Sequence, residues 1–197
     1  MKNYVSSDLH FSHKNIIKYC PDSRGHLNSV GEMNEVLINN FNNVLTEEDH
    51  IYLLGDIGFG SPESTMEFLK RINGTKTIIH GNHDRKLIAS PIFRNPSERR
   101  LAGIIEDTPY KVISQTIGGK KYGVVLFHFR IAEWDGMHHG SIHLFGHSHG
   151  TGPEQPGRCQ DIGVDTNNLM PYNLEDILRK LSNKPMTFSG HHDGARE

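Results

Sequence analysis

The sequence has little cysteine, no long hydrophobic run and no excess of either charge. Its 197 residues include only Cys20 and Cys159, too few for a disulfide framework and without the paired spacing of a zinc ribbon. No apolar run approaches the roughly 20 residues that cross a bilayer. The 21 basic and 23 acidic side chains give a formal net charge of −2, so no overall positive field attracts a nucleic acid backbone. These absences argue against a disulfide-rich secreted domain, a membrane protein and a strongly basic nucleic acid binder.

The composition fits a single folded domain. The chain is long enough for one sizeable core and too short for two ordinary domains joined by a linker. Hydrophobic residues make up 35% and charged residues 22%, with a mean hydropathy of −0.53, which is polar but within the globular range. We expect one domain over residues 1–184 and a flexible tail over residues 185–197, where periodicity is lost. A strand within the first eight residues leaves no room for a signal peptide and indicates a cytoplasmic protein.

The first half of the chain alternates strands with helices. Three short β-prone runs predict strands, at residues 3–7, 50–54 and 76–80. Helical periodicity lies between them, at residues 13–19, 30–45 and 62–72. The expected N-caps are Ser12, Ser29 and Ser61, and Glu32 completes a capping box behind Ser29. This alternation favours parallel strand pairing with helices covering the sheet.

The second half of the chain indicates antiparallel pairing. Residues 110–117 and 121–127 flank the glycine-rich segment 118–120, which is typical of a hairpin turn. Further strands are expected at residues 141–145 and 159–164. A helix over residues 174–181 then follows, with Asn173 as its cap. We therefore expect an α/β protein in which the two halves of the chain pair differently.

Histidine, in contrast, is abundant, with 14 residues in the chain. Several of these histidines lie in five short motifs, most of which follow a β-prone run, where a sheet presents functional groups to loops. In chain order the motifs are Asp8-Leu9-His10, Gly55-Asp56, Gly81-Asn82-His83-Asp84, the single His128, and Gly146-His147-Ser148-His149. All five supply oxygen or imidazole donors, so together they indicate a metal site.

The donor chemistry of the motifs favours catalytic transition metals. Asp8 and His10 lie two residues apart on a segment that we expect to be extended, so both side chains would leave on the same side and grip one ion. His147 and His149 repeat this arrangement, and Asp56 offers two oxygens that can bridge two cations. Mixed nitrogen and oxygen donors without cysteine favour Mn²⁺, with Zn²⁺, Fe or Co²⁺ as alternatives, over Ca²⁺ or a structural zinc.

Two further donors, Asn82 and His128, complete enough ligands for two divalent ions with positions left open for solvent and substrate. Two ions that share a bridging water would lower its pKa from about 15.7 towards about 7 and neutralise the oxygens of a phosphate ester. His83 could protonate the leaving alkoxide or stabilise charge on the phosphoryl group. Asp84 or a backbone carbonyl could fix the tautomer of His83. We therefore predict that a metal-bridging hydroxide hydrolyses a phosphate ester, assisted by His83.

The five motifs, in this order, resemble those of the calcineurin-like metallophosphoesterase superfamily. The resemblance covers residues 3–181. It points to a compact single-domain prokaryotic and phage branch through residues 11–17, through Trp134 with residues 138–140, and through residues 161–165. It implies a four-layer α/β/β/α sandwich, in which two mixed β-sheets pack face to face with helices outside. It also implies that His83 is a proton donor or transition-state stabiliser. The ligand set it implies is Asp8, His10, Asp56 and His149 for one metal and Asp56, Asn82, His128 and His147 for the other.

Departures from related patterns narrow the expected activity. Serine/threonine protein phosphatases of the superfamily carry Asp-Arg-Gly after the second motif and Glu after the Asn-His pair. This chain has Ile57-Gly58-Phe59 and Asp84 instead, so it looks more like a phosphomonoesterase or phosphodiesterase for nucleotides or other small esters. Ser12 stands where the branch has glycine, and Phe129-Arg130 stands where tyrosine and proline are usual.

Four residues near the motifs are candidates for substrate contact: His13, Asn15, Arg130 and His139. Capping and packing at a helix start explain His13 and Asn15 about equally well. Arg130 and His139 have the chemistry to bind phosphate, although a solvated surface explains them at least as well. Trp134 is interpreted as a loop anchor rather than a base-stacking platform.

Two other functions fit parts of the sequence. A non-catalytic protein-binding scaffold on the same fold would be expected to lose metal ligands, and none is missing from the motifs. A DNA nuclease of the same superfamily would be expected to carry a basic groove, which the near-neutral charge and short length disfavour. We expect a small phosphate ester as substrate, without a membrane or an obligate nucleic acid partner. Both a monoester and a diester fit the motifs.

Overall fold

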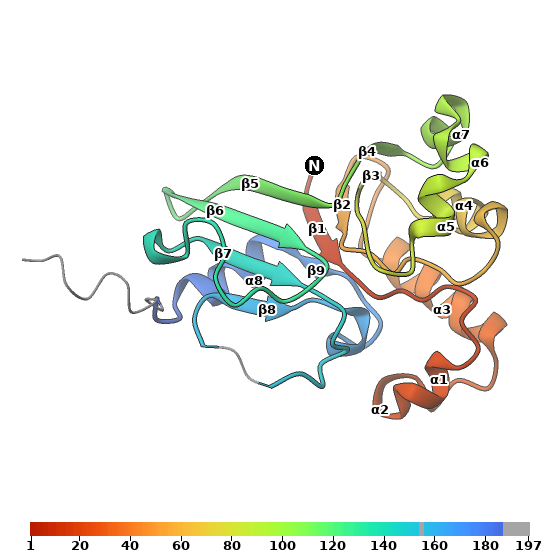
Figure 1. Cartoon of the computed structure of the whole chain (residues 1–197), viewed down its shortest axis with the longest axis horizontal. Helices are drawn as coiled ribbons and strands as arrows, with labels where there is room; N and C mark the ends of the chain where they lie inside the picture. Colours follow the sequence, from red (N-terminus) through yellow and green to blue (C-terminus); the bar gives the residue numbers. More distant parts are fainter. Residues whose placement is uncertain (154–155, 187–197) are drawn as a thin grey trace, which may run out of the picture.

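The computed structural model describes residues 1–153 and 156–186, and it contains two mixed β-sheets with helices (Figure 1). This confirms the predicted α/β class with two mixed sheets. The tail predicted over residues 185–197 lies outside the described residues from residue 187 onward. Among the described residues, no helix combines the length and the hydrophobicity that a membrane crossing requires.

The first sheet has five strands in the order β4-β3-β2-β1-β9. Strands β1 to β4 run parallel, as the strand–helix alternation predicted, and β9 pairs antiparallel with β1. The sequence did not indicate β4, an edge strand that carries two acidic residues, or β9, which has only two residues. The strands are β1 (Asn3–Ser6), β2 (His50–Leu53), β3 (Thr75–Ile79), β4 (Ile104–Thr108) and β9 (Tyr172–Asn173).

The second sheet has four strands in the order β5-β6-β7-β8, namely β5 (Tyr110–Ile117), β6 (Lys120–Phe127), β7 (Ile142–Phe145) and β8 (Cys159–Asp161). The predicted hairpin is confirmed, because β5 and β6 pair antiparallel through a turn in which Gly118 and Gly119 both have positive φ. Strands β6, β7 and β8 are parallel. The expected strand over residues 159–164 ends early, at Asp161, where its carboxylate accepts the N–H of Gly163 and the chain turns.

Two amphipathic helices cover the first sheet, and both begin at the predicted caps. Helix α3 (Val30–Asn42) is capped by Ser29, whose hydroxyl accepts the N–H of Glu32, and helix α4 (Pro62–Arg71) is capped by Ser61. Both bury an apolar stripe in one cluster with the outer face of β1, β2 and β3. In Figure 1 these helices gather on the opposite side of the first sheet from β5 to β8.

The helix expected over residues 13–19 is shorter than predicted. Ser12 has a φ of 62°, so it does not act as an N-cap, and its backbone and hydroxyl bond to Asn34 instead. Helix α1 (Ile16–Tyr19) therefore starts after Asn15, and Pro21 begins a second short helix, α2 (Pro21–Arg24). The prediction that Ser12 caps a helix from residue 13 is wrong because the loop before it takes a left-handed conformation.

Residues 85–101 form three short helices that the sequence did not indicate. Each of them is too short to show a hydrophobic period, and a proline begins two of them. They are α5 (Arg85–Ala89), α6 (Pro91–Arg94) and α7 (Pro96–Leu101). Arg99 and Arg100 lie on α7, which has no buried residue.

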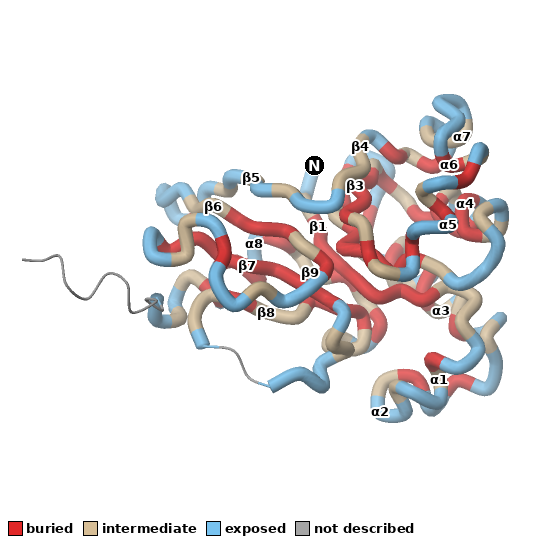
Figure 2. The backbone as a smooth tube through the Cα atoms, viewed as in Figure 1, coloured by how far each residue is buried: buried red, intermediate tan, exposed pale blue. Residues whose placement is uncertain are grey.

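A second apolar cluster lies between the sheets, with side chains from β1, β6 and β7 and with four residues of α8 (Leu174–Ser182). Asn173 caps α8, as predicted. On the outer face of the second sheet the buried Trp134 packs with residues of β6, β7 and β8, next to the 3-10 helix η1 (Met137–His139), so its predicted role as a loop anchor is confirmed. Figure 2 shows the buried backbone running through the central strands of both sheets.

Candidate functional site

All five sequence motifs begin where a strand ends. Strands β1, β2 and β3 are parallel neighbours in the first sheet, and β6 and β7 are parallel neighbours in the second. The motifs at residues 8–10, 55–56, 81–84, 128 and 146–149 follow these five strands in turn. Because the carboxyl ends of parallel strands meet at one edge, the two sheets bring all five loops together.

Five of the candidate ligands have a left-handed backbone: Asp8, His10, Asp56, His147 and His149, with φ between 48° and 69°. Such a conformation is uncommon for residues other than glycine and tends to cluster at functional sites. The expected reason for the proximity of Asp8 and His10, an extended segment, is therefore wrong. Instead, the Asp8 N–H donates to the Gly55 carbonyl and the His10 N–H donates to the Asp56 carbonyl. The left-handed backbone then directs the side chains of Asp8 and His10 towards each other.

Two glycines let these loops approach each other closely. Gly55 has a φ of 85°, and a Cβ placed on it would lie 2.5 Å from the Cα of Gly81. A Cβ on Gly146 would collide with the side chains of Ser7 and Asp8. The glycines that precede Asp56 and His147 are thus required by packing between the loops.

The first donor group consists of Asp8, His10 and His149, whose ligand atoms lie within 4.8 Å of one another. Asp8 Oδ1 is 3.9 Å from His10 Nε2 and 4.0 Å from His149 Nε2. The other oxygen, Asp8 Oδ2, accepts the N–H of His147 at 2.9 Å. One carboxylate oxygen therefore fixes the loop while the other faces two imidazoles.

The second donor group consists of Asp56, His128 and His147. His128 Nδ1 donates to the Leu54 carbonyl at 2.7 Å, which leaves its Nε2 facing Asn82 Oδ1 at 3.0 Å. In the neutral tautomer both of these facing atoms carry lone pairs, so either a metal ion or a proton on His128 Nε2 would satisfy them. Burial alone would lower the pKa of His128, but the Asp56 carboxylate raises it overall. The predicted ligand Asn82 thus lies with this group.

Asp56 lies between the two groups. Its Oδ2 is 3.7 Å from His10 Nε2 and 3.5 Å from His128 Nε2, so one oxygen faces an imidazole of each group. Its Oδ1 accepts the N–H of His83 at 3.0 Å. Asp56 and Asp8 thus share a pattern, in which one oxygen is held by backbone and the other is directed at imidazole nitrogens.

A buried ion pair that sequence reasoning missed supports the first group. Asp165 Oδ2 accepts a hydrogen bond from His149 Nδ1 at 2.7 Å, which leaves His149 Nε2 free to face Asp8. The fully buried Arg24 donates to both oxygens of Asp165 and to the backbone carbonyls of Asp8 and Leu9. A carboxylate behind a ligand histidine fixes the ring orientation and raises its basicity.

The pKa values of Asp165 and His149 follow from the contacts of these two side chains. Burial alone would raise the pKa of Asp165, but the hydrogen bonds from Arg24 and His149 hold it well below its usual value. Burial likewise lowers the pKa of His149, yet the Asp165 and Asp8 carboxylates raise it overall. The donor atoms of Cys20, His149 and Asp165 also lie close together. The positive charge beside Asp165 is already supplied by Arg24, so this group does not require a metal ion.

The two predicted catalytic residues have different surroundings. His83 is 45% exposed, its Nε2 lies 3.9 Å from Asp56 Oδ2, and its ring is 4.4 Å from that of Phe59. Asp84 is buried, and its carboxylate accepts the backbone N–H groups of Asp56, Ile57 and Gly81. Asp84 therefore joins the loops after β2 and β3, and its hydrogen bonds go to backbone N–H groups and not to the His83 ring, which was one of the two predicted ways to fix the His83 tautomer.

The residues around Asp8 and His10 fit a divalent cation. Asp8 Oδ1 and both ring nitrogens of His10 are buried and have no hydrogen-bond partner among the described residues. Burial without a cation raises the pKa of Asp8 to about 7 and lowers that of His10 to about 2. Unpartnered buried acceptors destabilise a fold unless a cation binds them, and this donor set suits transition ions.

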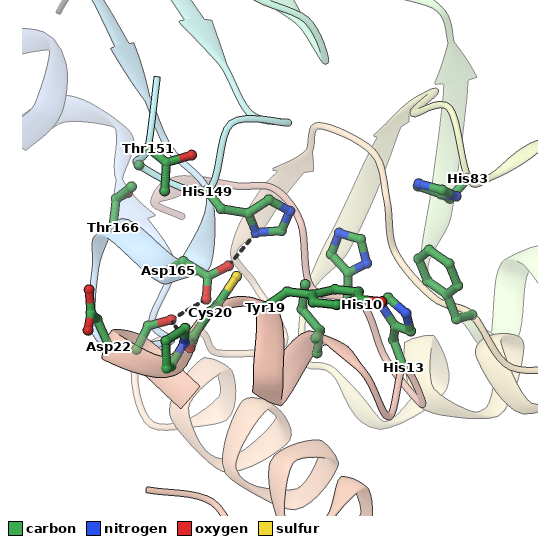
Figure 3. A pocket seen from close by; sticks show the side chains of 15 residues that line it. His10, His13, Tyr19, Cys20, Asp22, His83, His149, Thr151, Asp165 and Thr166 are labelled. Atoms are coloured by element: carbon green, nitrogen blue, oxygen red, sulfur yellow. Dashed lines mark hydrogen bonds and ion pairs between the residues drawn. The ribbon is translucent and has the colours of Figure 1, made fainter. Parts of the chain in front are cut away.

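A hollow of about 770 Å³ opens beside His10, His83 and His149 (Figure 3). Of the four predicted substrate-contact residues, only His13 lines it. Asn15 is exposed and precedes α1, and Arg130 lies in a smaller neighbouring hollow, where it donates to the Pro153 carbonyl. His139 lies beside the β5–β6 hairpin, among residues that include none of the predicted ligands.

Two proteins are similar to this chain in sequence. No family model matches the chain. An uncharacterized protein of Methanocaldococcus jannaschii is 43% identical over 86 residues, a match that covers 43% of this chain and 47% of that protein. The chain thus matches about half the length of that relative. The gene 66 protein of Mycobacterium phage L5 is 28% identical over 167 residues, which cover 74% of this chain and 76% of that protein.

Two solved structures are also similar. A protein of unknown function from Aquifex aeolicus matches with a TM-score of 0.62 and 23% identity, over 91% of this chain and 98% of that chain. This likeness shows a shared fold over nearly the whole of both chains. A nuclease of Pseudomonas putida matches with a TM-score of 0.41 and 19% identity, over 75% of this chain and 61% of that chain, too low to support an inference about this protein.

Proposed function

We propose that the chain is a metal-dependent phosphoester hydrolase of the calcineurin-like metallophosphoesterase superfamily, acting on a phosphate monoester or diester. The observation that carries the proposal is the position of Asp56 Oδ2, 3.7 Å from His10 Nε2 and 3.5 Å from His128 Nε2. A carboxylate oxygen that faces two separate groups of imidazole and oxygen donors is the arrangement that a pair of divalent ions requires.

Each donor group would hold one ion. Asp8, His10 and His149 would hold the first, and His128, His147 and Asn82 the second, with Asp56 shared between them. When bound, such ions lower the pKa of a water molecule and neutralise phosphoryl oxygens. We propose Mn²⁺ as the first choice, because mixed nitrogen and oxygen donors without thiolate suit it.

The chain's own residues would complete the reaction. A water oxygen forms a bond to phosphorus, and the ester oxygen leaves with the electron pair of the broken P–O bond. His83 is exposed beside Asp56 and can donate a proton to that leaving oxygen. Asp84 acts as a positioning residue, because it holds the backbone of Asp56 and Gly81 in place.

Metal content and hydrolysis test the proposal together. Purified protein should bind about two Mn²⁺ per chain and hydrolyse bis-p-nitrophenyl phosphate or p-nitrophenyl phosphate, and chelation should abolish both binding and turnover. A non-catalytic scaffold would show neither property. Protein that folds and binds two ions but hydrolyses neither compound, nor any of a panel of nucleoside mono-, di- and cyclic phosphates, would overturn the proposal.

His83→Ala tests the assignment of the proton donor. General acid catalysis contributes roughly 10²- to 10⁴-fold, and it matters most for a poor leaving group. The variant should therefore lose far more activity on an alkyl phosphate ester than on a p-nitrophenyl ester, whose leaving group needs no proton, while it keeps both ions. Equal losses on the two esters would contradict the role of His83.

A further inference from the structure

The hollow beside the donor groups has an aromatic wall. Phe59 is 38% exposed and lines it, with its ring 3.9 Å from that of His13 at an interplanar angle of 8°. Tyr19 is 68% exposed, and its ring extends across the hollow towards His13, whose ring centroid lies 6.1 Å away (Figure 3). His13 covers one face of the Phe59 ring, so the aromatic surface open to another ring consists of the exposed remainder of Phe59 and the more exposed ring of Tyr19.

The position of this wall ties it to the site of reaction. The Phe59 ring lies 4.4 Å from the ring of His83 and 5.0 Å from that of His10. Phe59 belongs to the loop that follows Asp56, and Tyr19 ends helix α1, which follows the loop of Asp8 and His10. A phosphoryl group at the donor groups would therefore place its ester substituent within reach of these rings.

The charge in the hollow limits what that substituent can be. The residues that line it, all in the described part of the chain, include no Lys or Arg. Its two carboxylates belong to Asp22 and Asp165, and Arg24 neutralises the second of these. A further phosphate in this hollow would meet the Asp22 carboxylate without a lysine or arginine to bind it, unlike the basic groove that follows a nucleic acid backbone.

We infer that the hollow formed by Phe59, Tyr19 and His13 binds a flat aromatic group of the substrate, so that the ester is a nucleotide or similar aryl phosphate rather than a sugar phosphate or a polynucleotide. The inference rests on the proposed function, since the phosphoryl group must bind at the donor groups. The hollow is large enough for a nucleoside, because ligand pockets of about 300–1,000 Å³ hold molecules of that size.

Two ligands that differ only in the base test the inference. Adenosine 5′-monophosphate and ribose 5-phosphate share the sugar and the phosphate, so the ratio of their inhibition constants isolates the contribution of the base. We expect adenosine 5′-monophosphate to inhibit hydrolysis of bis-p-nitrophenyl phosphate about tenfold more strongly, within the roughly 5- to 150-fold that stacking of one base supplies. Equal inhibition constants in the wild-type protein would overturn the inference.

Variants of the aromatic wall locate the effect. Phe59→Leu keeps an apolar side chain but removes the flat ring, and Tyr19→Ala removes the other ring. Each should lower the ratio several-fold towards one, mainly by weakening adenosine 5′-monophosphate. Tyr110→Ala is the matched control, because Tyr110 is 39% exposed and lies on β5. If Phe59→Leu and Tyr19→Ala both leave the ratio of inhibition constants at the wild-type value, as the control should, the assignment of the aromatic wall is contradicted.

The charge of the hollow is tested by a second phosphate. Adenosine 3′,5′-bisphosphate should bind more weakly than adenosine 5′-monophosphate, and Asp22→Asn should recover part of the loss. Stronger binding of the bisphosphate would favour a nucleic acid substrate and overturn this part of the inference. Calorimetric titration of the Mn²⁺-loaded protein gives the same ratios without turnover. Failure of the proposed function, seen as absent hydrolysis, is thus distinguishable from failure of the aromatic site.

Discussion

The two donor groups at the strand ends share Asp56 but are supported in different ways. Behind the first group lies a buried ionic network, in which Arg24 binds Asp165 and Asp165 binds His149. Behind the second group lies a neutral contact, in which His128 Nδ1 donates to the Leu54 carbonyl. Asp8 and His10 are almost fully buried, whereas His147 in the second group is exposed.

This difference in support predicts that the two donor groups bind their ions differently. A buried, charge-paired group is positioned by folding itself, so its ligands lose little freedom when an ion binds. A group with an exposed ligand completes its geometry only when the ion arrives, and it faces solvent and substrate. We therefore expect the first group to hold its ion more tightly and the second to exchange its ion more readily.

Removal of the shared carboxylate should have the largest effect, because it damages both groups. In Asp56→Ala we expect the metal content to fall from about two ions to below one, and activity to fall by more than the roughly 100-fold that loss of an outer contact produces. Elemental analysis and initial rates measure both. Asp107→Ala, which removes a partly exposed carboxylate paired with His80 and Arg99, is the control. Two ions retained by Asp56→Ala would contradict the shared role.

Removal of Arg24 should test the support of the first group through stability. Arg24→Ala leaves Asp165 buried without its cation, which lowers the free energy of unfolding by roughly 3–5 kcal/mol. Arg71→Ala breaks a comparable two-point pair with Glu35 on the exposed surface, where the expected loss is much smaller because solvent screens both charges. Urea denaturation compares the two variants. Equal losses would mean that the buried network contributes no more than a surface ion pair.

Acid should loosen the support of the second group before that of the first. His143 accepts the N–H of Ile131 in the segment after His128 and donates to the Val125 carbonyl, and burial lowers its pKa to about 4. A lowered pKa means that the stabilisation is complete above about 6.5 and is lost as the pH falls towards 4. By pH 5 the loss is about 2 kcal/mol.

His143→Gln removes this titration and should flatten the pH dependence of unfolding between pH 7 and pH 5. The protection factor of the Ile131 amide, which corrects for the slower intrinsic exchange at lower pH, should fall over the same range in the wild-type protein alone. Asp165 behaves in the same sense but over a lower pH range. Its folded-state pKa lies well below the usual carboxyl value, so its stabilisation is complete above that usual value and is lost only as the pH falls towards the folded-state pKa. Parallel pH profiles in the two proteins would contradict the role of His143.

Local sequence patterns predicted the elements that deliver the donors. The strands before Asp8, Asp56 and Asn82 and the caps at Ser29 and Ser61 depend on neighbouring residues, so periodicity and capping chemistry suffice to find them. The proximity of the five motifs then follows from parallel strand order. The roles of the motif residues as metal ligands stay predictions that the experiments above address.

Features that depend on distant contacts were not predictable in this way. Arg24 and Asp165 are 141 residues apart, and neither lies in a motif that marks it as a partner of the other. The left-handed backbone at Asp8 and His10 arises from hydrogen bonds to the neighbouring loop, not from residue type. His139 precedes strand β7, whereas the predicted ligands His147 and His149 follow that strand. His139 therefore lies at the opposite end of β7 from the donor groups, beside the β5–β6 hairpin.

Asp165 therefore offers the most selective test of the comparison between the groups. Asp165→Asn keeps the shape of the side chain and removes the charge behind His149, which should weaken the first ion by roughly 10- to 100-fold. The second ion should be unaffected, because the hydrogen bonds of Asp165 within the described part of the chain go to Ser23, Arg24 and His149 and not to His128 or His147. Calorimetric titration of metal-free protein with Mn²⁺ resolves the two affinities, and circular dichroism checks the fold. Equal weakening of both ions would show that the groups are not supported independently.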